Sequence, residues 1–144
     1  MTIATILATK GGKVFTISPE RTIRQALAVL ADHNVGALVV VDEAGRPIGI
    51  VSERDIVREA ARSEQLFSRT VGDIMTRDVV VGQPQDDLKT VANTMTEKRI
   101  RHLPVVDRGK LVGIVSIGDV VKAQRDQYEG EVDTLQAQIL QGRD

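Results

Sequence analysis

The chain has 144 residues, of which 42% are hydrophobic and 27% are charged, and its formal net charge is −1. This length and composition are typical of one globular domain with a single core. A near-neutral chain without a clustered basic surface does not suit sequence-independent nucleic-acid binding, and aromatic residues, at 2%, are too few for base stacking. The absence of cysteine excludes disulfides, thiolate metal ligands and a cysteine nucleophile.

No apolar run reaches membrane-spanning length, and the first residues, Met1 to Ala4, do not begin a signal peptide. We therefore expect a cytoplasmic protein with neither a membrane nor a nucleic acid as its partner. The two histidines, His33 and His102, show neither a metal-ligand spacing nor a triad pattern. No metal site, no catalytic residue and no enzyme activity are predicted.

The first half of the chain reads as strand, helix, strand, strand, helix. The β-branched run 14–17 ends at a Ser-Pro pair and predicts a strand, and apolar residues at helical spacing predict a helix over 22–32. Two apolar runs around a Gly-containing turn predict a β-hairpin over 37–51, after which Ser52 begins a second helix.

The second half repeats this order after a polar connector. The connector contains a short helical turn at residues 71–75. The run 79–81 predicts a strand, a helical pattern starts at Leu88, a hairpin covers 103–115, and Ser116 begins the last helix of the repeat.

A tail follows Tyr128. Val132, Leu135 and Ile139 are spaced as the narrow apolar face of an amphipathic helix. We expect this tail to dock on the rest of the chain or on a dimer partner.

The duplication is sharpest in one heptad. Residues 49–55 and 113–119 both read Gly-Ile-Val-Ser-x-x-Asp, and residues 22–42 align with 87–107 at one constant spacing. Such agreement marks an internal repeat. Because each unit is too short to bury a sufficient core alone, the two units should pack on each other.

Ser-x-x-Asp between a strand and a helix has two interpretations. Serine at the N-cap with an acidic residue at N3 is close to a capping box, and the acid also suits the helix dipole. Alternatively, the carboxylate accepts hydrogen bonds from a ribose diol while the helix N-terminus receives a phosphate. The ligand interpretation gains from three features: aspartate is a methylene shorter than the Glu or Gln that capping boxes prefer, Gly-Ile-Val is repeated too, and a glycine permits close approach of a ligand.

The chain resembles the tandem repeats of the CBS domain family, named after cystathionine β-synthase. The resemblance lies in the two heptads, in the segment Leu-Val-Val-Val-Asp or Leu-Pro-Val-Val-Asp that precedes each of them, and in the connector motif Val71–Thr76. The resemblance covers most of the chain and implies an α/β (α+β) fold of two pseudo-symmetric β-α-β-β-α repeats packed as one module. The implied divisions are repeat 1 at 1–63, a connector at 64–76, repeat 2 at 77–128 and the helical tail at 129–144. It also implies adenosyl ligands in clefts between the repeats and a homodimer of CBS pairs.

The resemblance implies two nucleotide-binding sites. In the family the aspartate of the heptad holds the ribose diol, and the serine contacts ribose or phosphate. Site A would contain Ser52, Arg54, Asp55, Thr76, Asp78, Val79, Arg101, His102 and Pro104. Site B would contain Ser116, Asp119, Lys13, Val14, Ala37 and Leu38, with Lys10 as an alternative to Lys13 for the phosphate.

The basic residues make site A the better phosphate site. Arg54 lies between Ser52 and Asp55 and offers a planar head with several donors, whereas site B has Ile-Gly in the matching place. Each residue also has a plainer explanation: Arg54 and Arg101 as solvated charges at helix ends, and His102 as a hydrogen-bonded structural histidine.

The function implied is a regulatory module that binds an adenine nucleotide and signals to an unidentified protein partner by a conformational change. AMP is the first choice of ligand, followed by NAD(H), ATP or ADP. S-adenosylmethionine is disfavoured, because the basic residues of site A favour a phosphate over its cationic sulfonium. Two alternatives remain: a ligand-free adaptor or dimerisation module, and an orphan nucleotide-processing enzyme.

Overall fold

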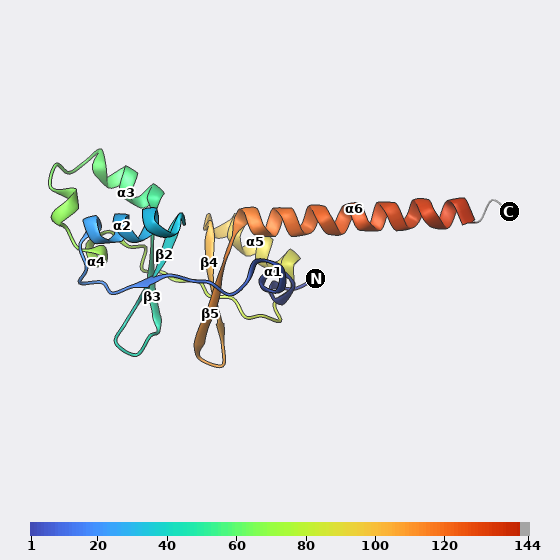
Figure 1. Cartoon of the computed structure of the whole chain (residues 1–144), viewed down its shortest axis with the longest axis horizontal. Helices are drawn as coiled ribbons and strands as arrows, with labels where there is room; N and C mark the ends of the chain where they lie inside the picture. Colours follow the sequence, from blue (N-terminus) through green and yellow to red (C-terminus); the bar gives the residue numbers. More distant parts are fainter. Residues whose placement is uncertain (142–144) are drawn as a thin grey trace.

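The molecule consists of two lobes of the same architecture, in each of which a small β-sheet is covered by helices (Figure 1). The computed structural model describes residues 1–141. The two sheets lie next to each other in the middle, and the helices cover their outer sides. This mixture of helices and strands in both lobes confirms the predicted α+β class.

The first lobe follows the predicted order of elements. It contains β1 (Thr16–Ile17), α2 (Ile23–His33), β2 (Ala37–Val41), β3 (Pro47–Ser52) and α3 (Glu53–Ala60). The strands form one sheet in the order β1-β2-β3, with β1 parallel to β2 and β2 antiparallel to β3.

The connector and the second lobe also contain the expected helices and hairpin. The connector holds a 3-10 turn, η1 (Leu66–Ser68), and the short helix α4 (Val71–Ile74). The second lobe contains α5 (Leu88–Lys98), β4 (His102–Asp107), β5 (Lys110–Ser116) and α6 (Ile117–Gln141), with β4 and β5 antiparallel.

The strand predicted at residues 79–81 does not form. Only Gly82 pairs with β4, through a parallel bridge in which the Gly82 N–H donates to Pro104 O at 2.8 Å. In the first lobe, the Val39 N–H extends the matching ladder by donating to Phe15 O at 3.1 Å. Pro104 takes the place of Val39 in the second repeat and has no N–H, so this hydrogen bond is lost and the strand shrinks to a bridge.

A helix that was not predicted, α1 (Ile3–Lys10), precedes the first repeat but packs on the second. Ile3 and Ile6 are buried in the second lobe, and Gly11, at φ 91°, ends the helix. The connector helix α4 takes the equivalent place in the first lobe, where Val71 is fully buried. Each of these two helices therefore precedes one repeat and completes the core of the other.

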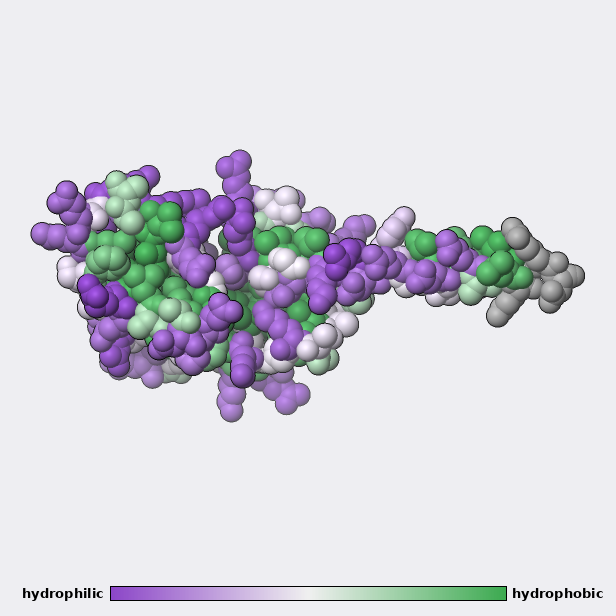
Figure 2. All heavy atoms as spheres, turned by 45° about the horizontal axis from the view of Figure 1, so that its top comes forward, coloured by the Kyte–Doolittle hydropathy of each residue, from purple (hydrophilic) through white to green (hydrophobic). Residues whose placement is uncertain are grey.

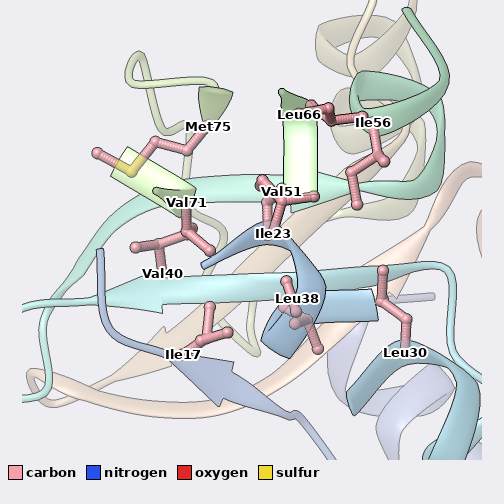
Figure 3. Close-up of a cluster of buried hydrophobic side chains, with 11 residues drawn as sticks. Ile17, Ile23, Leu30, Leu38, Val40, Val51, Ile56, Leu66, Val71 and Met75 are labelled. Carbon is pink, nitrogen blue, oxygen red and sulfur yellow. The ribbon is translucent and has the colours of Figure 1, made fainter. Parts of the chain in front are cut away.

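Each lobe has its own hydrophobic core. The core of the first lobe consists of Ile17, Ile23, Ala26, Leu30, Leu38, Val40, Val51, Ile56, Leu66, Val71 and Met75 (Figure 3). The core of the second lobe consists of Ile3, Ile6, Leu88, Val91, Met95, Leu103, Val105, Val115 and Val120. Because side chains alternate along a strand, Leu38 and Val40 point into the first core, whereas Ala37 and Val39 are buried on the opposite face of β2.

The predicted tail is helical but is not a separate element. The helix α6 continues without a break from the second repeat to Gln141, and residues 142–144 of the predicted tail lie outside the described residues. Figure 1 shows this helix extending away from both lobes, so the expectation that the tail docks on its own module is wrong. No helix within residues 1–141 combines the length and the apolar character that crossing a bilayer requires.

The glycine that opens each heptad makes room for a neighbouring segment of the same chain. A Cβ on Gly49 would lie 2.5 Å from Met75 Sδ and 3.0 Å from Thr76 O. A Cβ on Gly113 would lie 2.9 Å from Leu7 Cδ2. The structure thus gives this repeated glycine a packing role, in place of the expected close approach of a ligand.

We expect Gly49→Ala to lower the free energy of unfolding by about 1–3 kcal/mol, because the added methyl group overpacks the contact with Met75. Urea denaturation followed by circular dichroism would measure the loss. Gly130→Ala is the matched control: Gly130 lies within α6 with nothing inside 4 Å of an added Cβ, so this change should be neutral or stabilising. Equal midpoints for Gly49→Ala and the wild type would contradict the packing role.

Candidate functional site

The two Ser-x-x-Asp motifs lie at equivalent strand-to-helix junctions. Ser52 ends β3 opposite Ala37 of β2, and Ser116 ends β5 opposite His102 of β4. The first helical N–H groups are also satisfied in the same way, because Glu53 N donates to Gly36 O at 3.0 Å and Ile117 N donates to Arg101 O at 2.9 Å. Each junction is therefore bound to the start of the preceding strand in its own lobe.

Both aspartates form capping boxes. Asp55 Oδ2 accepts hydrogen bonds from Ser52 N and Ser52 Oγ, each at 3.0 Å, and Asp55 N donates to Ser52 Oγ at 3.3 Å. Asp119 Oδ2 accepts from Ser116 N at 2.9 Å, and Asp119 N donates to Ser116 Oγ at 3.1 Å. The expectation that aspartate is too short to reach back is wrong, and helix capping accounts for the local geometry of both motifs.

The capping geometry occupies only one oxygen of each carboxylate. Within residues 1–141, every hydrogen bond to Asp55 or Asp119 side-chain oxygens goes to Oδ2, and Oδ1 accepts none. Both aspartates are half-buried. Each therefore holds a fixed orientation while one oxygen stays available to accept a hydroxyl hydrogen bond.

A lysine distinguishes the second site from the first. Lys10 Nζ lies 2.6 Å from Asp119 Oδ2 and also donates to Ile114 O at 2.9 Å. Among the ion pairs of the described residues, none involves Asp55. The structure therefore brings Lys10, the alternative, rather than the predicted Lys13 to the Asp119 carboxylate.

The surroundings of Asp119 favour its charged form. Burial alone would raise the pKa of Asp119, but the hydrogen bonds from Lys10 and the Ser116 backbone, with the charge of Lys10, outweigh it and hold the pKa below its ordinary value. Asp119 is therefore an anion that is already paired with a cation of the same chain.

His102 lies between the two motifs. Its Nε2 would be 4.0 Å from a Cβ on Gly36, so its ring reaches from β4 to the start of β2 in the other lobe. Burial, followed by the charge of Lys10, lowers the pKa of His102, whereas Asp119 and Asp55 act in the opposite direction. The lowered pKa favours the neutral form of the His102 ring at pH 7.

Of the other residues predicted for site A, Thr76 is tied by its backbone to the strand that ends at Ser52. Thr76 pairs with Ile50, two residues before Ser52, through backbone hydrogen bonds of 3.0 and 2.9 Å. Among the remaining residues of site A, Arg54, Asp78 and Arg101 are exposed, and Val79 is half-buried. The arginines are accessible for a phosphate, and no hydrogen bond or ion pair within residues 1–141 fixes their side chains.

Three predicted lining residues are buried. Leu38, predicted for site B, is fully buried in the first core, so its side chain cannot line a cleft and only its backbone can face a ligand. Pro104, predicted for site A, is buried within β4. Of the others predicted for site B, Ala37 is buried on the opposite face from Leu38, and Val14 is half-buried.

Sequence reasoning missed three contributors to this region. The start of β2 at Gly36, the Ile114 carbonyl and the helix α1 that carries Lys10 all take part. A signal for α1 was present, since Ile3, Ile6 and Leu7 follow helical spacing.

Two cavities lie away from the heptads at equivalent places in the two lobes. One, of about 350 Å³, lies between β1 and α2, and the other, of about 340 Å³, lies between Gly82 and α5. Neither is lined by a residue predicted for site A or site B. Among the described residues, no three His, Asp or Glu side chains gather closely enough to hold a metal ion.

We expect Lys10→Met to raise the pKa of Asp119, which carboxyl-carbon NMR titration would measure. The folded-state pKa lies below the unfolded value, so the pair stabilises the protein above about pH 4 and this stabilisation is lost as pH falls through the folded pKa. Because both side chains are partly exposed, the loss at pH 7 should not exceed about 1 kcal/mol. Lys13→Met is the control, and an equal effect of both changes would contradict the pairing.

We expect the wild-type protein to lose stability as pH falls below about 6.5, because the unfolded chain takes up a proton at His102 before the folded chain does. His102→Gln cannot be protonated and should reduce this pH dependence. Urea denaturation at a series of pH values between about 5 and 8 would measure both slopes. Identical slopes for the two proteins would contradict the assignment to His102.

Comparison with known proteins identifies the same family in both halves of the chain. The model of the family described as CBS domain matches residues 6–62 and 71–126. The mitochondrial CBS domain-containing protein CBSX3 of Arabidopsis thaliana is 35% identical over 150 residues, covering 98% of this chain and 73% of the relative.

Two solved structures are similar over nearly the whole chain. The CBS-domain containing protein ATU1752 from Agrobacterium tumefaciens has a TM-score of 0.81 and 38% identity, covering 86% of this chain and 99% of that one. The CBS domain pair of protein MJ0100, in complex with 5′-methylthioadenosine and S-adenosyl-L-methionine, has a TM-score of 0.77 and 29% identity, covering 88% and 98%.

Proposed function

The chain belongs to the CBS domain family, and from this membership we propose that it is a regulatory module that binds an adenine nucleotide between its two repeats. The observation that carries the proposal is the pair of half-buried aspartates at the strand-to-helix junctions. Each is oriented by its capping box through Oδ2 and keeps Oδ1 for a ligand hydroxyl. A related pair, that of MJ0100, holds adenosyl compounds, which supports this ligand class.

The main site we propose is site A, around Asp55. Its carboxylate is not neutralised by an ion pair among the described residues, and Arg54 and Arg101 are exposed cations that can meet a phosphate. Site B differs because Lys10 already neutralises Asp119. A ribose diol at site B must share or displace that cation, so site B should bind the same ligand more weakly.

AMP is the ligand we propose first, with NAD(H), ATP and ADP as further candidates. Arg54 and Arg101 are the reason for this preference, because a guanidinium attracts a phosphate but repels the cationic sulfonium of S-adenosylmethionine. The complex between MJ0100 and S-adenosyl-L-methionine concerns a protein 29% identical to this one, and the titration below therefore includes that compound.

Regulation would operate through the arrangement of the lobes. A ligand held between two lobes favours the arrangement that it binds more tightly, and a protein partner can detect that change. The proposal therefore includes a homodimer of CBS pairs, an as yet unidentified regulated protein and a cytoplasmic location, with no catalytic step.

One observation favours a second function, that of an adaptor without a ligand. The capping boxes and the packing of Gly49 and Gly113 account for the repeated glycine, serine and aspartate of the heptad without a nucleotide. If no adenosyl compound binds, these contacts leave a rigid two-lobed scaffold as the function of the chain.

The decisive experiment is calorimetric titration of the nucleotide-free protein with AMP, ATP, NAD and S-adenosylmethionine. Saturable binding of one or two molecules per chain would support the proposal and identify the ligand. No heat with any compound, together with an unchanged melting temperature, would favour the adaptor.

We expect Asp55→Ala to weaken nucleotide binding by about 10- to 100-fold, the usual effect of losing a charged hydrogen-bond partner. Asp119→Ala should weaken it less. Because alanine also removes a helix cap, Asp55→Asn tests the charge at unchanged size, and Asp133→Ala on exposed α6 is the control. Equal losses at Asp55 and Asp119 would contradict the assignment of site A as the main site.

A further inference from the structure

The projecting part of α6 carries an apolar stripe that the chain itself does not cover. Tyr128, Leu135 and Ile139 are 67%, 58% and 53% exposed, and Val132 lies between them on the same helix. Figure 2 shows apolar residues on this projecting helix, beyond the main body of the molecule. The stripe lies outside the family match, which ends at residue 126.

The spacing of the stripe is that of a coiled coil. From Tyr128 the apolar positions advance by four, three and four residues, which places Val132 and Ile139 at a positions and Tyr128 and Leu135 at d positions of a heptad. A surface of this kind fits the same pattern on another helix, where side chains insert between four residues of the partner. A second copy of this chain supplies such a helix.

The charges on α6 favour an antiparallel arrangement. Glu129, Glu131 and Asp133 form an acidic stretch without a basic residue, whereas residues 134–141 carry no charge. Parallel helices would place the two acidic stretches side by side, and antiparallel helices place each beside the uncharged part of the partner. A parallel pair would also bring Arg125, at an a position, against its own copy.

We propose that residues 128–139 of α6 pair antiparallel with the same segment of a second copy of this chain. Tyr128 then packs on the partner's Ile139, and Val132 packs on the partner's Leu135, which gives four apolar layers by symmetry. Beside the layers, Glu129 lies next to the partner's Gln136, and Glu131 lies next to the partner's Gln138. Each carboxylate thus meets an amide donor rather than another acid.

Cysteine cross-linking tests both the pairing and its direction, since the natural chain has no cysteine to interfere. Single Tyr128→Cys and Ile139→Cys variants are mixed under reducing conditions and then oxidised. In the antiparallel pair Tyr128 and its own copy are about 16 Å apart along the helix, which exceeds the reach of a disulfide, whereas the mixed pair is in contact.

We expect the mixed disulfide to exceed either self-disulfide at least about tenfold. A dominant Tyr128→Cys self-disulfide would overturn the antiparallel direction. Yields no higher than those of Ala137→Cys, on the opposite side of the helix, would overturn the pairing itself. Because the readout is specific to these positions, an interface between the lobes cannot imitate it.

A second measurement uses the full chain and sedimentation equilibrium. Leu135→Glu places a charge in the apolar layers and should weaken self-association at least about tenfold. Ala137→Glu adds the same charge on the solvent side and should change the association constant by less than about twofold. An equal effect of the two changes would overturn the proposal.

Discussion

The reciprocal packing of α1 and α4 is the constraint on which both lobes depend. Neither repeat buries a full core with its own residues, and the helix that precedes one repeat supplies side chains to the other. The glycines at 49 and 113 admit these segments, because a side chain there would meet Met75 or Leu7. The two halves are thereby tied together through the chain that connects them, and the strand-to-helix junctions keep fixed positions.

Those junctions give each aspartate a structural role and leave one of its oxygens without a hydrogen bond among the described residues. A carboxylate with two oxygens can cap a helix with one and still offer the other to a ligand, so capping and ligand binding are compatible interpretations of Ser-x-x-Asp. The two sites differ in whether a lysine forms an ion pair with the aspartate. Lys10 reaches Asp119 only because α1 ends beside β5, and the connector provides no lysine at the equivalent place beside Asp55.

Much of this fold could be predicted from the sequence, because the repeated heptads and the hairpin turns are local patterns. The lost strand at residues 79–81 depends on Pro104, whose missing N–H was visible in the sequence. The resemblance placed Lys10 and Asp119 in one site, with Lys10 as a phosphate contact, but not as an ion pair, since the pair joins residues 109 positions apart through the packing of α1. The burial of Leu38 follows from the alternation of β2, which an unbroken apolar run does not reveal.

The duplication also separates the positions that packing requires from those that it leaves free to differ. Packing requires the two halves to stay alike at the glycines, the serines and the aspartates, and there they are alike. The differences lie in Arg54 against Gly118, His102 against Ala37, and the long α6 against the short α3. None of these differences is needed to form a lobe, because the other lobe folds without it. They are therefore the positions at which the two halves can differ without loss of the fold that they share.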